Sequence, residues 1–175
     1  MTSFIIQAHE NRELPQSWRD HPECPFCRII TGEASAFKVY EDEKVIAVLD
    51  ILPLRPGHTL VIPKTHISRV SELPEDFAAA TGIAITKVSH ALTQALEHTA
   101  LNVVCNQEYA QAVPHVHYHI IPAPRFDGTS PQAFPRDRVT LALSQQEMHK
   151  KEFEAREELD DEDANALLAK IHAKL

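Results

Sequence analysis

Three histidines alternate with apolar residues in the stretch PHVHYHIIP, residues 114–122. A period of two is typical of a β-strand, in which successive side chains point to opposite faces of the sheet. The pattern therefore predicts that His115, His117 and His119 share one face, while the apolar residues between them face the core. Because proline cannot donate a hydrogen bond to a neighbouring strand, Pro114 and Pro122 should flank this strand.

Such a row of imidazoles has three interpretations. It could be a chance alternation, or a three-histidine metal site, because histidine is the commonest metal ligand. It could also be a nucleophile with two helpers, since neutral imidazole attacks phosphorus without first losing a proton and neighbouring imidazoles can hold phosphate oxygens. We favour the third interpretation, with His115 as the histidine that a metal could recruit instead.

A second group of reactive side chains is the pair Cys24-x-x-Cys27, which has the spacing of zinc ligands. A redox pair and two unreactive thiols are the alternatives. The third cysteine, Cys105, lies in a predicted strand and is expected to be a core residue. Three cysteines behind an N-terminus that does not resemble a signal peptide suit a reducing compartment, so we expect a cytoplasmic location, with the nucleus as an alternative.

The composition of the 175 residues, 43% hydrophobic and 24% charged, is that of an ordinary globular domain. The net charge of −8 argues against binding to nucleic acid or to a membrane surface. No apolar run approaches the roughly 20 residues of a membrane span. Most of the negative charge is confined to residues 147–163, so an anionic substrate is not repelled by the rest of the chain.

The elements that must position these residues alternate between strands and helices, which indicates an α+β fold. A long helix is predicted from about Pro74 to His98, and a short helical turn should end at Gly32. A final helix should begin at Asp160 or Asp161 and present a solvated charged face. Predicted strands occupy residues 37–40, 44–49, 58–62, 101–105 and 114–122. The expected division is an N-terminal arm (1–20), one domain (21–143) and an acidic helical extension (144–175), with a possible capping box at Ser144 and Glu147.

The histidine stretch resembles the His-φ-His-φ-His-φ-φ motif (φ, apolar) of the histidine triad (HIT) superfamily, and of its Hint-like branch in particular. Further segments match that family in order and spacing: CPFCRII (24–30), the run from YED (40–42) to DI (50–51), and HTLVIPKTHI (58–67). The resemblance covers about residues 22–125. It implies a five-stranded antiparallel sheet with a long helix and a short N-terminal helix, followed here by a C-terminal helical extension, in a homodimer.

The resemblance also implies roles for individual residues. His117 would attack the α-phosphorus of a purine nucleotide to give a nucleotidyl-imidazole, and water would then release the nucleoside monophosphate. His119 and His58 would hydrogen-bond to the phosphate oxygens and to the leaving group. The remaining implied substrate contacts are Asp50 for the ribose hydroxyls, Asn106 and Gln111 for phosphate oxygens, Phe26 and Ile29 around the base, and Ile51 beside Asp50.

A structural zinc ion is a further implication, because relatives of this family hold zinc with two cysteines and two histidines. The matching residues are Cys24, Cys27, His66 and His115. Four such ligands leave no open position, so this zinc would tie the N-terminal segment to the catalytic strand without entering the chemistry. No organic cofactor is expected.

We therefore expect hydrolysis of adenosine or guanosine phosphoramidates. One departure from the family pattern is Ala112, which stands where the phosphoramidase branch carries a serine that can protonate a leaving amine. This departure keeps open the alternative of dinucleoside polyphosphate (Ap3A or Ap4A) hydrolysis, which has a phosphate leaving group and tolerates the loss of the serine better. Alternatives of other classes are a nucleotide-binding scaffold with vestigial activity and a zinc-dependent module whose histidines are metal ligands.

Overall fold

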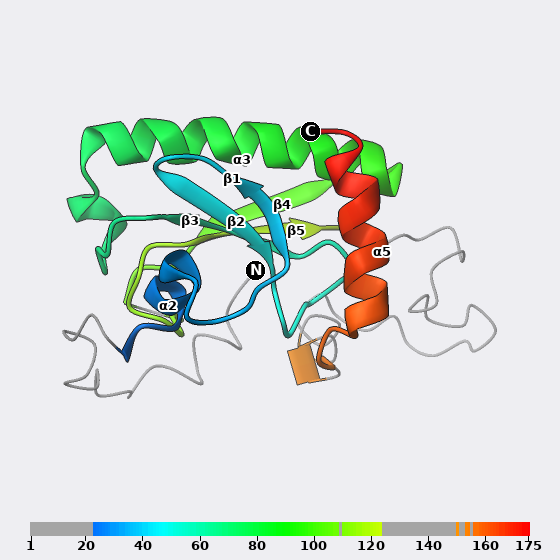
Figure 1. The fold of residues 1–175 in the computed structure, drawn as a ribbon, viewed down its shortest axis with the longest axis horizontal. Coiled ribbons are helices and arrows are strands. Elements are labelled where there is room, and N and C mark those ends of the chain that lie inside the picture. Colours follow the sequence, from blue (N-terminus) through cyan, green and yellow to red (C-terminus); the bar gives the residue numbers. More distant parts are fainter. Residues whose placement is uncertain (1–22, 109, 124–149, 151–152, 155) are drawn as a thin grey trace.

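The computed structural model describes residues 23–108, 110–123, 150, 153–154 and 156–175 (Figure 1). The predicted N-terminal arm, residues 1–20, and the predicted capping box at Ser144 and Glu147 lie outside these residues. The boundaries of the three expected segments stay a prediction.

Five strands form one antiparallel sheet in the order β1-β2-β3-β5-β4. This confirms the predicted α+β class and all five strands, although the ends of four of them shift by one to a few residues. The strands are β1 (Lys38–Glu41), β2 (Val45–Leu49), β3 (Thr59–Pro63), β4 (Leu101–Cys105) and β5 (Tyr118–Pro122).

The predicted histidine strand starts too early. β5 begins only at Tyr118, so His115 and His117 precede it and His119 alone lies within it. The amide of Val116 donates to the Ile67 carbonyl at 2.7 Å, and the amide of His115 donates to the Val113 carbonyl at 2.8 Å. These bonds take the backbone before Tyr118 out of the ladder and into contact with the loop after β3.

The two faces of the sheet have different coverings (Figure 1). Alternate residues of β2, such as Val45 and Ala47, belong to a core shared with α3 (Glu75–Leu96), whereas Ile46 and Val48 pack with the short helix α2 (Pro25–Thr31). This alternation follows from the two-residue period of a strand. The sheet therefore separates a main core from a smaller cluster on the opposite face.

Helix α3 begins and ends as its sequence predicts. Pro74 is the N-cap, and Glu75 and Asp76 follow in the first turn, near the positive end of the helix dipole. Its buried stripe, at helical spacing, is Thr81, Ala84, Val88, Ala91 and Leu92. Within the described part of the chain, neither this 22-residue helix nor any shorter one has the length and apolarity needed to cross a membrane.

Helix α5 (Asp161–His172) confirms the predicted C-terminal helix. Asp160 is its N-cap, and its side chain accepts hydrogen bonds from the amides of Glu162 and Asp163. Most of its residues are solvent-accessible, as expected, but Ala164 and Ile171 are fully buried in the same core as α3. One face of helix α5 is therefore part of the main core.

We predict that Gly57→Ala destabilises the fold by about 2–4 kcal/mol, measured by urea unfolding. Gly57 has a φ of +87°, and a Cβ there would lie 2.9 Å from Leu96 Cδ1 and 3.2 Å from Pro122 Cγ. The matched control is Gly82→Ala in α3, where a Cβ meets nothing within 4 Å. That change should stabilise by about 0.5–1 kcal/mol because alanine favours helix. Equal effects of the two substitutions would contradict this account of Gly57.

Candidate active site

Three of the predicted histidines meet on the sheet face opposite α3. His58 directly precedes β3, His117 directly precedes β5, and His119 pairs with Leu60 of β3 inside the sheet. The ring centroids of His117 and His119 are 4.9 Å apart, and those of His119 and His58 are 5.2 Å apart. The predicted nucleophile and its two helpers therefore form one contiguous group.

The hydrogen bonds of His117 define which ring nitrogen is free. Its Nδ1 lies 2.6 Å from the backbone carbonyl oxygen of His115, and a carbonyl can only accept, so Nδ1 carries the proton. The Nε2 atom of the neutral ring then keeps its lone pair. The edge contact with the Phe26 ring, at a centroid distance of 5.0 Å, packs this largely buried imidazole from the side of α2.

His58 and His119 are joined in a chain of hydrogen bonds. The amide of Leu54 donates to Nδ1 of His58 at 3.1 Å, which leaves the proton of the neutral ring on Nε2. That Nε2 lies 3.0 Å from Nδ1 of His119, which therefore accepts. The remaining proton of His119 is on its Nε2, where it can be donated to a ligand.

Burial keeps these imidazoles neutral. It is the main cause that lowers the pKa of His119 to about 2, with help from His117 and His58. Burial also lowers the pKa of His58 to about 3, assisted by the positive charges of Arg156 and Arg55. The pKa of His117 is lowered for the same reason, although its bond to the His115 carbonyl opposes the shift.

Asp50 lies beside His58, with Oδ2 at 3.4 Å from Nδ1. Its other carboxylate oxygen accepts from the Leu52 amide at 2.9 Å, and its own amide donates to the His58 carbonyl. Because His58 is neutral and already accepts at Nδ1, this contact is not an ion pair at pH 7. Burial raises the pKa of Asp50. The predicted ribose-binding acid thus lies at the His58 end of the site.

The three apolar residues of the predicted substrate site differ in exposure. Phe26 is buried and Ile29 partly buried in the cluster on the α2 side of the sheet, whereas Ile51 is 60% exposed. Phe26 is the only one of them with a ring contact to His117 among the described residues. Their contact with a base stays a prediction.

The predicted amide ligands lie in the loop after β4. Asn106 directly follows that strand and is partly buried. Gln111 is buried, and its side chain is engaged by the chain itself: Nε2 donates to the Ser68 carbonyl at 2.8 Å and Oε1 accepts from the Glu108 amide at 2.7 Å. The structure therefore gives Gln111 a loop-positioning role, and phosphate contact by both amides stays a prediction.

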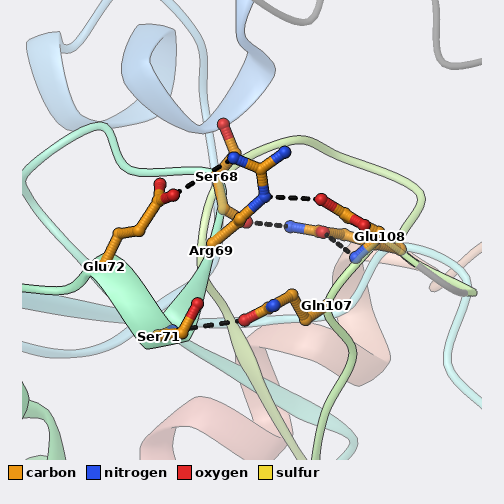
Figure 2. A network of polar contacts seen from close by, with 7 residues as sticks. Ser68, Arg69, Ser71, Glu72, Gln107 and Glu108 are labelled. Carbon is orange, nitrogen blue, oxygen red and sulfur yellow. Dashed lines mark hydrogen bonds and ion pairs between the residues drawn. The ribbon is translucent and has the colours of Figure 1, made fainter.

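Figure 2 shows what else holds this loop. Arg69 bridges Glu72 and Glu108, and the Ser71 amide donates to the Gln107 side chain at 3.2 Å. Exposed ion pairs of this kind are individually weak. Together with Gln111, however, they connect the segment after β3 to the loop that carries the predicted phosphate ligands.

The predicted zinc ligands Cys24, Cys27, His66 and His115 come together. Their ligand atoms all lie within 4.8 Å of one another. Cys27 Sγ is 3.2 Å from His66 Nδ1 and 3.6 Å from His115 Nδ1. Tetrahedral zinc with bonds of about 2.0–2.3 Å separates nitrogen and sulfur ligands by roughly 3.5 Å, so the spacing fits.

Two further observations support a metal at these residues. The Nε2 of His115 lies 2.7 Å from the Pro63 carbonyl, so it carries the proton and leaves the Nδ1 lone pair directed at the thiols. A metal-binding histidine usually donates its second N–H in this way. Burial and the adjacent Cys24 raise the pKa of Cys27 to about 12, so two thiolates here require a cation beside them.

A second set of metal-ligand types, Asp50, His58 and His119, also lies within 4.8 Å. In this set, Nε2 of His58 is already hydrogen-bonded to Nδ1 of His119, and Nδ1 of His58 already accepts from the Leu54 amide. The hydrogen-bonded chain accounts for this cluster without a metal.

A family model for the HIT domain matches residues 31–126, so the chain belongs to the HIT family. Among curated relatives it is similar to Protein hit of Bacillus subtilis, with 46% identity over 101 residues, 57% of this chain and 70% of that protein. It is also similar to the adenylylsulfatase HINT3 of Arabidopsis thaliana, with 38% identity over 102 residues, 57% of this chain and 52% of that protein. The predicted membership of the superfamily and its Hint-like branch is confirmed.

Among solved structures, the fold is similar to a Zn-bound histidine triad family protein from Mycobacterium smegmatis. The TM-score is 0.64 at 29% identity, covering 87% of this chain and 96% of that one. This match confirms the HIT-like fold.

Three contributors to the site were missed at the sequence level. The His115 carbonyl and the Leu54 amide set the tautomers of His117 and His58, but backbone groups leave no trace in side-chain patterns. Arg156, in the acidic extension, helps to lower the pKa of His58 through its positive charge. The sequence shows it only as one of several charged residues in that extension.

We predict that the free energy of unfolding falls as the pH is lowered from about 6.5 towards 3. In the unfolded chain these histidines take up protons near pH 6.5, whereas the folded pKa values of His58 and His119 are about 3 and about 2. Each should contribute up to about 1.4 kcal/mol per pH unit in that window. Urea unfolding at pH 7, 6 and 5 measures the slope, which His119→Gln should reduce and His90→Gln, on the exposed side of α3, should not. A pH-independent stability would contradict the assignment.

Proposed function

We propose that this chain is a nucleotidyl hydrolase that attacks the α-phosphate of a purine nucleotide with His117 and releases the nucleoside monophosphate. The observation that carries the proposal is the bond from His117 Nδ1 to the His115 carbonyl, because it leaves an unprotonated Nε2 on a neutral, oriented ring. Membership of the HIT family and similarity to an adenylylsulfatase support the same class of reaction.

The reaction has two steps. In the first, the Nε2 lone pair forms a bond to the α-phosphorus while the bond from phosphorus to the leaving group breaks. His119 Nε2–H, held through His58, donates to a phosphate oxygen or to the leaving group as negative charge develops. In the second step, water attacks the phosphorus and gives up a proton to the solvent, the bond from phosphorus to Nε2 breaks with its electron pair returning to His117, and the nucleoside monophosphate is released.

The nature of the leaving group separates two candidates. A phosphoramidate must release an amine, which has to take up a proton, but Ala112 has no hydroxyl to supply one. The low pKa values of His58 and His119 make them hydrogen-bond donors at pH 7 rather than charged acids. Nucleotide anhydrides such as Ap3A, Ap4A and adenylyl sulfate expel ADP, ATP or sulfate, each of which departs on a phosphate or sulfate oxygen that needs no proton. These features therefore favour the anhydrides over the phosphoramidates.

We also propose a structural zinc ion at Cys24, Cys27, His66 and His115. When bound, it would supply the positive charge that stabilises two thiolates and would tie α2 to the segment before β5. The chain's own residues would then hold the His115 carbonyl in place for His117.

The expected homodimer stays a prediction. Two exposed apolar side chains, Val103 on the edge strand β4 and Ile83 on α3, support it because each offers apolar surface for a second copy. The absence of nucleic-acid and membrane partners, and the cytoplasmic or nuclear location, also stay predictions.

We predict that His117→Ala lowers kcat by about 10³-fold or more while AMP still binds, because only the nucleophile is lost. Steady-state hydrolysis of adenosine phosphoramidate, Ap4A and adenylyl sulfate measures the loss and ranks the leaving groups. Retained turnover in this variant would exclude His117 as the nucleophile. Wild-type binding of AMP without turnover of any of the three would favour the scaffold alternative.

We predict one zinc ion per chain, and loss of this metal in Cys27→Ser, measured by elemental analysis after dialysis. The matched control is Cys105→Ser, since Cys105 lies in β4 outside the cluster and should leave the zinc content unchanged. Removal of zinc should lower the melting temperature because the metal links segments distant in sequence. Full zinc content in the Cys27 variant would contradict this ligand set.

A further inference from the structure

The segment before α5 is attached to the edge of the active site. The amide of Leu159 donates to the carbonyl of Ile51 at 2.9 Å, and Ile51 is the neighbour of Asp50. Helix α5 anchors the other end of this segment, because Ala164 and Ile171 are fully buried in the main core. The bond to Ile51 and the buried face of α5 therefore hold residues 156–160 next to the loop between β2 and β3 that contains Asp50 and Ile51.

Arg156 is fixed at the start of this segment. Its guanidinium carbon lies 3.7 Å from the centroid of the Phe153 ring, and its Nε donates to the Phe153 carbonyl at 3.0 Å. These contacts orient the planar group but use only one of its five N–H donors. Although acidic residues abound nearby, Arg156 makes no ion pair within 4 Å with any carboxylate of the described residues.

The charge of Arg156 acts on the Asp50–His58 end of the site. It opposes the rise of the Asp50 pKa that burial causes, and it adds to the burial that lowers the pKa of His58. Asp50 in turn favours the charged form of Arg156, against partial burial. The bond from Leu159 to Ile51 and these charge interactions together place Arg156 near the Asp50–His58 end of the proposed site, with donors that its contacts with Phe153 do not use.

We propose that Arg156 is a specificity-determining residue that binds a second anionic group of the substrate, besides the α-phosphate attacked by His117. This inference rests on the proposed function and deepens it. The guanidinium suits a phosphate or sulfate oxygen pair, which it can bind with two parallel hydrogen bonds. The anionic group could be the leaving phosphate or sulfate of an anhydride, or a phosphate on the ribose beside Asp50.

Three nucleotides distinguish these sources: AMP, ADP and adenosine 3′,5′-bisphosphate. Binding is measured by titration calorimetry on the full chain carrying His117→Ala, so that nothing is hydrolysed. The Arg156-containing protein should bind ADP, the bisphosphate or both at least about tenfold more tightly than AMP. Tighter binding of ADP assigns Arg156 to the leaving group, and tighter binding of the bisphosphate assigns it to the ribose side.

Arg156→Gln should abolish this preference while changing AMP affinity by less than about threefold, and Arg156→Lys should retain part of it because the charge remains. The matched control is Lys150→Gln, which removes one positive charge from the same acidic stretch at a side chain that is 61% exposed. It should leave all three affinities unchanged.

Several outcomes would overturn the proposal. Equal losses for all three ligands, with a lower melting temperature, would mean that Arg156 only supports the Asp50 loop. An unchanged preference in Arg156→Gln would exclude contact with either anionic group. Neither outcome affects AMP binding or turnover by the wild-type chain, so the proposed function would survive. Failure of the wild-type chain to bind AMP would contradict the proposed function and the role of Arg156 together.

Discussion

The hydrogen bond from His117 Nδ1 to the His115 carbonyl is the constraint on which the site depends. It fixes the tautomer and the orientation of the proposed nucleophile at once. The carbonyl can do this only because its own residue is held: the His115 ring donates to Pro63 and faces Cys24 and Cys27, and the next amide, of Val116, bonds to Ile67. The Cys/His cluster and His117 are thus connected by one short piece of backbone, residues 115–117.

The two faces of the sheet carry different kinds of residues. One face is packed by α3 and α5 and holds the large aliphatic core, and the other carries the imidazoles with Phe26 and the Cys/His cluster. Because of the two-residue period of a strand, alternate residues of β3 and β5 contribute to the two faces. Polar groups on the face opposite α3 hydrogen-bond to one another, as the chain from the Leu54 amide through His58 to His119 illustrates.

Much of the fold could be predicted because its signals are local. The caps of α3 and α5, the αL glycine after α2 and the strand periods are all readable from neighbouring residues. The start of β5 was predicted wrongly because it depends on the bond between Val116 and Ile67, 49 positions apart in sequence. Arg156 escaped notice for a similar reason, since only the folded chain brings it to Asp50. Cys24 and Cys27 were predicted from their spacing, and His66 and His115 from the resemblance to zinc-binding relatives; the structure brings the four together.

The position of β5 between β3 and β4 gives the two central histidines unequal local stability. His119 lies in an interior strand and is bonded through both neighbours, so exposing its backbone requires opening the sheet itself. His117 lies just outside that ladder, on a stretch fastened by a few loop bonds. Local opening of the backbone around His117 should therefore cost less free energy than opening around His119, because only the latter requires the sheet itself to separate.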